Sequence, residues 1–189
     1  MLTGSVMTIN YGRNKLMIAR HEAGHAIAAR VLGINIKYAT LEDVNGYPQT
    51  VTESASHRRP GDPDALEQDA IVALAGPQAQ QRHRPLSQSE MDSAWEDGGG
   101  WCDDKLIATN YLLMLQKRRW GEPVVRGQVE LEGQRLQEFI DLFNCTLAKT
   151  ASLVDQHWPA ICRVAKALMS DRALSEAEID ALIEGSGSP

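Results

Sequence analysis

The pentapeptide His21-Glu22-Ala23-Gly24-His25 contains the residues of this sequence that are best suited to chemistry. Residues four apart lie on one face of a helix, so both imidazoles can bind the same ion, and histidine nitrogens are ordinary zinc ligands. Glu22 projects about a quarter turn away, where its carboxylate can take a proton from a water on the ion without being a ligand. The spacing predicts a Zn²⁺ site with His21 and His25 as ligands and Glu22 as the general base of amide hydrolysis.

The helix that carries this motif is predicted over residues 14–32, where apolar residues recur at helical spacing and Gly33 follows as a stop. Two imidazoles and a carboxylate without partners would be costly to bury in such an apolar helix. A bound metal compensates for that cost, whereas an accidental histidine pair does not. Ala23 and Gly24 also leave space beside the ion.

A catalytic zinc needs a third protein ligand and one open position. The histidine candidates are His57 and His83, each beside an arginine in an expected loop, and His157 at the end of a long helix. The acidic candidates lie between Glu90 and Asp104, a stretch with six acids and no base. Histidines in such places are more typical of surface or packing positions, and spacing does not rank the acids. The residues by themselves leave the third ligand open.

The elements that must position these groups are mostly helical. β-branched and aromatic residues between 34 and 53, around Asn45-Gly46, predict a short hairpin or two edge strands. We expect a loop over the segment SHRRPGDP that starts at Ser56. Asp62 and Pro63 then predict the N-terminus of a helix that reaches about residue 81, with a bend at Gly76-Pro77.

Residues 85–100 are rich in serine, glycine and acids, which predicts a mobile, solvated loop whose composition also suits a flap over the site. Asp103 or Asp104 is expected to cap the next helix, which ends near Arg119. From about Gln128 onward the sequence has a helical pattern. Pro159 predicts the start of a second helix in this region, and Ser175 with Glu178 forms a capping box that predicts the start of the last one. The predicted fold class is predominantly α, within α+β.

The composition excludes several classes of protein. With 189 residues, 43% hydrophobic and 23% charged, the chain is typical of one globular domain. A net charge of −6 argues against nucleic-acid partners. Apolar runs are too short to cross a membrane, and we see no secretory signal. Three cysteines without CxxC spacing suit a reducing compartment, so we expect a cytoplasmic protein.

Several stretches resemble the zinc peptidase domain of the FtsH-type, membrane-anchored AAA proteases. Beyond the HEAGH motif, residues 71–76 resemble that family's apolar helix ending in glycine. Residues 104–109 (DKLIAT), followed by Trp120-Gly121, resemble its Asp-x-x-x-Ala-Thr helix. The Trp158-Pro159 break and the helices around it resemble its C-terminal region. The likeness covers roughly residues 15–184.

The resemblance implies that Asp104 is the third zinc ligand, with Asp103 as the alternative if the register shifts by one residue. It places residues 38–53 at a substrate-lining strand, to which an extended peptide adds through main-chain hydrogen bonds. Two departures from the family stand out: Trp101 where a small residue is usual, and Gln80-Gln81 in place of an acidic pair. Without an acidic partner, we expect the zinc ligands to be less firmly oriented.

The resemblance also sets the expected organisation: one peptidase domain over 1–189, with a zinc-binding lobe at about 14–121, a C-terminal helical region at about 123–184, and tails at 1–10 and 185–189. The expected function is zinc-dependent endoproteolysis of unfolded or extended polypeptides. No GxxxxGK[ST] phosphate loop is present, so we expect no ATPase of its own, and a separate AAA unfoldase or a homo-oligomer as partner. The alternatives are an inactive zinc-binding interaction module and a hydrolase of small amides.

Overall fold

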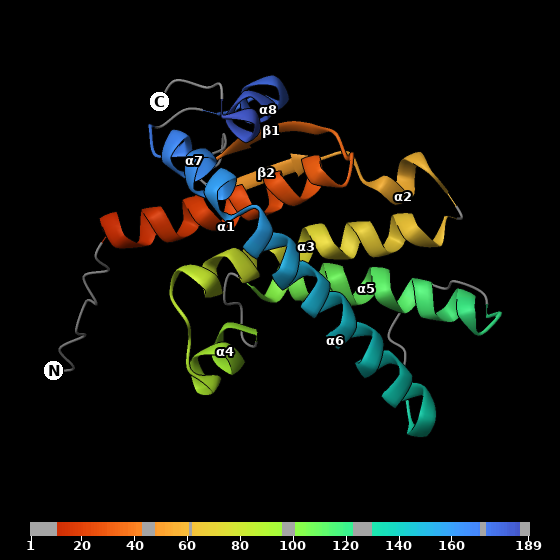
Figure 1. The fold of residues 1–189 in the computed structure, drawn as a ribbon. Coiled ribbons are helices and arrows are strands. Elements are labelled where there is room, and N and C mark those ends of the chain that lie inside the picture. The colour runs from red at the N-terminus through yellow and green to blue at the C-terminus, as the bar shows by residue number, and fades with distance from the viewer. Residues whose placement is uncertain are drawn as a thin grey trace, which may run out of the picture.

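The computed structural model describes residues 11–42, 48–60, 62–95, 101–122, 130–170 and 173–185. Helices dominate these residues, with one small antiparallel sheet, which confirms the predominantly α expectation (Figure 1). The elements are α1 (Tyr11–Val31), β1 (Ile36–Thr40), β2 (Gln49–Thr52), α2 (Ala55–Arg58), α3 (Pro63–His83), α4 (Gln88–Trp95), α5 (Cys102–Arg119), α6 (Gly133–Gln156), α7 (Trp158–Leu168) and α8 (Glu176–Glu184).

The helices α1 and α3 pack closely against each other at the centre of the structure. Their contact is made by small residues: Ala19, Ala23, Ala75 and Ala79 are fully buried. At Gly24 the approach is closest, because a Cβ built there would lie 2.5 Å from the Ala75 carbonyl oxygen. The motif-bearing face of α1 is therefore held directly against α3.

The helix α5 packs on the other side of α3, so that α3 lies between α1 and α5 while α6 crosses them (Figure 1). A cluster of buried apolar side chains from α3, α5 and α6 holds this side together, and its largest members are Leu66, Leu74, Leu112, Leu115 and Leu142. This packing fixes the N-terminal end of α5 near the middle of α1 and α3. The N-terminal end of α5, which is far from α1 in the sequence, thus lies beside the HEAGH motif.

The two strands form the expected hairpin, with Tyr38 opposite Val51 and Thr40 opposite Gln49. The expected turn at Asn45-Gly46 lies outside the described residues. The outer edge of β1 is occupied, because Ala39 and Leu174 exchange two backbone hydrogen bonds of 2.8 and 2.9 Å. Within the described residues β2 pairs only with β1, and no described strand lies along its other edge.

We expected a loop over the segment SHRRPGDP, and this expectation is wrong in part, because the first three residues of the segment belong to the short helix α2. Asp69, which projects from α3, accepts hydrogen bonds from the backbone N–H groups of Ala55 (2.7 Å) and Ser56 (2.9 Å) and from the Ser54 hydroxyl (2.7 Å). A carboxylate at a helix N-terminus satisfies donors that the helix leaves unpaired. The helical turn therefore depends on a residue of another element, which local sequence does not show.

The expectation of a loop over residues 85–100 is also wrong in part. Residues 88–95 form α4, and residues 96–100 lie outside the described residues. Ser87 and Glu90 form reciprocal contacts at its start: the Ser87 N–H donates to the Glu90 carboxylate (2.9 Å) and the Glu90 N–H donates to the Ser87 hydroxyl (3.4 Å). This is the S-x-x-E capping pattern, and the serine-rich, acidic composition concealed it.

The helix starts differ in how well they were predicted. Asp62 caps α3 by accepting from the Asp64 N–H, and Ser175 with Glu178 forms the expected capping box of α8. The expected cap of α5 is wrong: Trp101 occupies that position, and Asp103 and Asp104 lie within the first turn. The Asp104 carboxylate is therefore not used as a cap and points elsewhere. No helix of the described residues has the length and apolar character to cross a membrane.

Replacing Gly24 with alanine tests the close packing of α1 on α3. Helix propensity alone predicts that Gly24→Ala stabilises the protein by about 1 kcal/mol. Because the new Cβ would lie 2.5 Å from a backbone oxygen, we expect destabilisation by about 1–3 kcal/mol instead. Equilibrium unfolding in guanidinium chloride measures the difference, and equal or greater stability of the variant contradicts this packing.

Candidate metal centre

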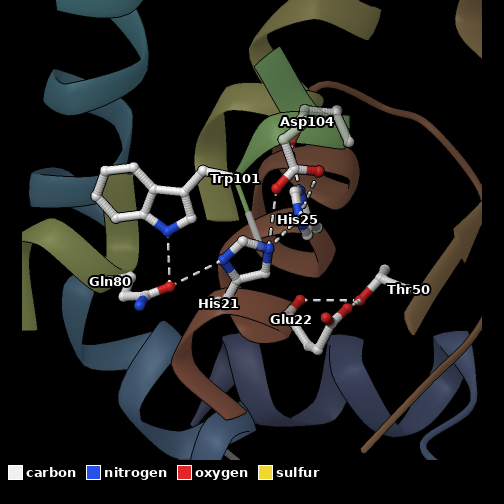
Figure 2. Close-up of polar contacts among 8 residues, drawn as sticks. His21, Glu22, His25, Thr50, Gln80, Trp101 and Asp104 are labelled. Carbon is white, nitrogen blue, oxygen red and sulfur yellow. Dashed lines mark hydrogen bonds and ion pairs between the residues drawn. The ribbon is translucent and has the colours of Figure 1, made fainter. Parts of the chain in front are cut away.

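The two histidines of the motif project from one face of α1 towards α3. Their Nε2 atoms lie 3.1 Å apart, and the two rings are nearly perpendicular (Figure 2). Each is fixed at its other nitrogen: His25 Nδ1–H donates to the Val72 carbonyl at 2.7 Å, and His21 Nδ1 lies 3.3 Å from Gln80 Oε1. Hydrogen bonds at Nδ1 leave the Nε2 lone pairs free to bind a metal.

Asp104 brings a carboxylate to the same point from the first turn of α5. Its Oδ2 is 3.0 Å from His21 Nε2, and its Oδ1 is 3.5 Å from His25 Nε2. The three side chains form a group whose ligand atoms all lie within 4.8 Å of one another. Asp103, the alternative by one residue, is exposed and is not part of the group.

The three other histidines do not join this group. His57 is exposed and is not part of the group. His83 contacts the Arg20 guanidinium, and burial together with that cation lowers its pKa. His157 lies between α6 and α7 as the residue that ends one helix and precedes the next. Among the residues that the structure describes, only Asp104 completes the histidine pair.

The separations fit a tetrahedral ion. With metal–ligand bonds of about 2.0–2.1 Å, tetrahedral geometry places neighbouring ligand atoms about 3.3 Å apart. The two Nε2 atoms lie 3.1 Å apart, and each lies 3.0 or 3.5 Å from one of the two Asp104 oxygens, so the separations are close to that value. Asp104 Oδ2 is also buried, and apart from the His21 imidazole it has no polar partner among the described residues, which is costly unless a cation lies beside it. His21, His25 and Asp104 therefore fit Zn²⁺ and leave a fourth position for water.

The electrostatics of the group favour a positive charge at its centre. Burial is the largest single influence on His25 and by itself lowers its pKa, but the charge of Asp104 and its contact with the ring, together with Glu22 and the Val72 carbonyl, outweigh burial and raise the pKa to about 9. Burial by itself raises the pKa of Asp104, yet the positive charge of His25 and the close contacts with both imidazoles hold it well below its usual range. Without a metal, a proton on His25 Nε2 balances the aspartate. A zinc ion that binds here must displace that proton.

Glu22 lies beside the group and faces the strand β2. Only 5% of its surface is exposed. The Thr50 hydroxyl donates to Glu22 Oε2 at 3.0 Å and also lies 2.9 Å from the Glu22 backbone oxygen (Figure 2). Thr50 therefore fixes the direction of the carboxylate, a role that sequence analysis did not assign. No local pattern signals it, because the contact joins a strand to a helix.

The group forms part of the wall of an open cavity of about 920 Å³. Residues of α1, β2, α3 and α5 line it together with Trp101, which precedes α5, and they include Gln49, Thr50, Val72, Ile107 and the metal-binding group. Ile107 and Ile18, which also lines the cavity, are 46% and 37% exposed, so part of the wall is apolar and open to solvent. A ligand much larger than water can reach the group.

Comparison with known proteins identifies no family. No family model matches the chain, and no curated protein matches its sequence. The resemblance to the FtsH-type peptidase domain stays a prediction that rests on the ordered motifs.

Sequence analysis placed Gly76 at an expected bend and at the end of an apolar stretch, and the structure shows a further role for it. It lies inside α3 opposite the two imidazoles, and a Cβ built there would be 2.3 Å from His25 Nε2 and 2.8 Å from His21 Nε2. Any side chain at this position would enter the space where the ligand atoms meet. The glycine thus provides the room that two ring nitrogens and an ion require.

The variant Gly76→Ala should lose zinc affinity while keeping the fold. Alanine favours the helix, but its Cβ would push both imidazoles out of position. We expect the dissociation constant for zinc, measured by chelator competition, to rise about tenfold or more. The far-UV circular dichroism spectrum serves as the control for folding. Unchanged affinity would show that the ion, if bound, lies elsewhere.

Proposed function

We propose that this protein is a zinc-dependent endopeptidase that hydrolyses unfolded or extended polypeptides. The observation that carries the proposal is the convergence of His21 Nε2, His25 Nε2 and an Asp104 carboxylate at zinc-ligand spacing in the wall of an open cavity. Glu22 lies next to them on the same helix and is oriented by Thr50. Three ligands, one open position and an adjacent carboxylate are the parts that metal-assisted amide hydrolysis needs.

In this mechanism zinc would acidify a bound water and polarise the scissile carbonyl. Glu22 accepts a proton from the water as it attacks the carbonyl carbon, and then delivers the proton to the leaving amine nitrogen. His21 and His25 would bind the ion through Nε2 as neutral imidazoles, while their Nδ1–H groups donate hydrogen bonds to Gln80 and Val72. Asp104 supplies one negative charge, which partly neutralises the ion.

The open edge of β2 supports a polypeptide substrate. Within the described residues β2 has a partner on one side only, and its residues Gln49, Thr50 and Thr52 line the cavity. An extended peptide can add to such an edge by main-chain hydrogen bonds, which are independent of its sequence. Added there, it would run past Glu22, to which Thr50 is bonded. Only a segment without its own secondary structure can bind in this way.

We further propose that the chain has the FtsH-like peptidase fold and acts in the cytoplasm. The order of elements supports the fold: a zinc-ligand helix, a hairpin, an apolar helix, an aspartate-bearing helix and a helical tail. The cysteines Cys102, Cys145 and Cys162 are all unpaired, which suits a reducing compartment. A separate AAA unfoldase or further copies of the chain remain the proposed partners.

The variant Glu22→Gln tests the catalytic role of the carboxylate. Glutamine keeps the size of the side chain and can still accept a hydrogen bond from Thr50, but it does not act as a base. We expect zinc content to stay at the wild-type level while cleavage of fluorescently labelled, unfolded casein falls about 100-fold or more. Cleavage at the wild-type rate contradicts the role of Glu22. Zinc binding without cleavage by the wild type would favour the inactive zinc-binding module.

The variant Thr50→Val tests the orientation of Glu22. Valine matches threonine in shape but cannot donate to the carboxylate, and hydrogen bonds to charged groups contribute about 1.5–3 kcal/mol. We therefore expect kcat to fall about tenfold, with zinc affinity unchanged. Thr52→Val, on the same strand and in the same cavity, is the matched control and should retain kcat. An equal effect of both variants would mean that the loss comes from the strand itself.

A further inference from the structure

The two residues that depart from the family pattern, Trp101 and Gln80, contact each other beside the metal centre (Figure 2). The indole Nε1–H of Trp101 donates to Gln80 Oε1 at 2.8 Å, and Trp101 is only 3% exposed. The same oxygen lies 3.3 Å from His21 Nδ1. A continuous chain of contacts therefore joins Trp101, through Gln80, to one ligand of the proposed zinc.

The chemistry of these groups fixes the direction of every hydrogen bond in the chain. An indole nitrogen is only a donor, so it selects the oxygen of the Gln80 amide and turns the NH₂ group away. A carbonyl oxygen accepts two hydrogen bonds and donates none, so His21 Nδ1 must carry the proton. The Nε2 atom of His21 is then the lone-pair nitrogen, and it lies 3.0 Å from Asp104 Oδ2. The amide oxygen thus selects the metal-binding tautomer of His21.

Resting on the proposed function, we infer that Trp101 and Gln80 are a positioning pair that holds His21 in its metal-binding tautomer and thereby sets the zinc affinity. An acidic residue at position 80 would accept the same hydrogen bond, but it would add a second negative charge near Asp104. A glutamine amide has two orientations, and in one of them its NH₂ group would face the imidazole. The Trp101 indole excludes that orientation because it donates to the amide oxygen. The tryptophan and the glutamine act as one unit.

The helix α4 supports this pair from outside. The Trp95 ring lies edge-on to the Trp101 ring with centroids 5.0 Å apart, and Lys105 Nζ lies 5.8 Å from the Trp95 centroid. Trp101 also directly precedes α5, the helix that carries Asp104. One short stretch of chain therefore places both a zinc ligand and the group that orients another ligand.

Metal affinity, measured on the full chain without any substrate, tests this inference. Gln80→Met removes the acceptor at similar size, and we expect the zinc dissociation constant to rise about 10- to 100-fold. Trp101→Phe keeps an aromatic ring but removes the donor, and should raise it about tenfold. Gln80→Glu retains the acceptor and should bind zinc at least as tightly as the wild type. Trp95→Phe keeps an aromatic ring against Trp101 and changes no hydrogen bond between Trp101, Gln80 and His21, so it is the matched control and should bind zinc as tightly as the wild type.

The double variant separates positioning from general damage. If Trp101 acts through Gln80, Trp101→Phe adds no further loss of affinity in the Gln80→Met background, whereas independent structural damage adds in full. The visible spectrum of the Co²⁺-substituted protein should change in the Gln80→Met variant and not in Trp95→Phe. Additive losses, or wild-type affinity in both single variants, overturn the inference.

The outcomes also distinguish this inference from the proposed function. Wild-type protein that binds neither zinc nor cobalt overturns both. Wild-type protein that binds zinc, with unaltered affinity in Gln80→Met and Trp101→Phe, overturns the positioning pair and leaves the peptidase proposal standing. The expected affinity losses in a protein that cleaves no polypeptide uphold the positioning pair and overturn the peptidase proposal.

Discussion

The close packing of α1 against α3 is the constraint on which the site depends. Gly24 lets the two backbones approach, and Gly76 keeps α3 from filling the space that the imidazoles need. The same contact brings the Val72 carbonyl to His25 and the Gln80 amide to His21. With larger residues at Gly24 of α1 and Gly76 of α3, the same motif would be present, but its histidines would have neither the space nor the hydrogen-bond partners that orient them. The small residues at this helix contact thus determine where the two imidazoles lie.

The second organising interaction is electrostatic. The Val72 and Gln80 oxygens accept hydrogen bonds from the Nδ1–H groups of the two histidines. The two Nε2 lone pairs and the Asp104 carboxylate then face one another at distances of 3.0–3.5 Å. Such an arrangement of acceptors is stable only with a cation among them. A proton on His25 meets this need in the metal-free protein, which explains the raised pKa of that residue. In the proposed metal-bound protein, zinc would meet it with more charge and would leave a position for water near Glu22.

Sequence analysis was most informative where the determining contacts are local. Helical spacing alone places His21 and His25 on one face, and Ser175 with Glu178 signals the start of α8. The third ligand is different, because the position of Asp104 depends on how α5 packs on α3. Spacing left it open, and the structure brings it to the histidine pair while Asp103 stays outside. The roles of Thr50, Gly76 and the Trp101–Gln80 contact arise only from packing between elements, so no local pattern predicted them.

The most direct test of the central claim is the zinc content of the purified protein, determined by mass spectrometry of the metal in wild type, His21→Ala, Asp104→Ala and Asp103→Ala. The geometry predicts one zinc per chain in the wild type and in Asp103→Ala, because Asp103 lies outside the group. It predicts strongly reduced zinc in His21→Ala and Asp104→Ala, because each removes one of three ligands. Full zinc content in Asp104→Ala, or none in the wild type under zinc-replete conditions, would contradict the account.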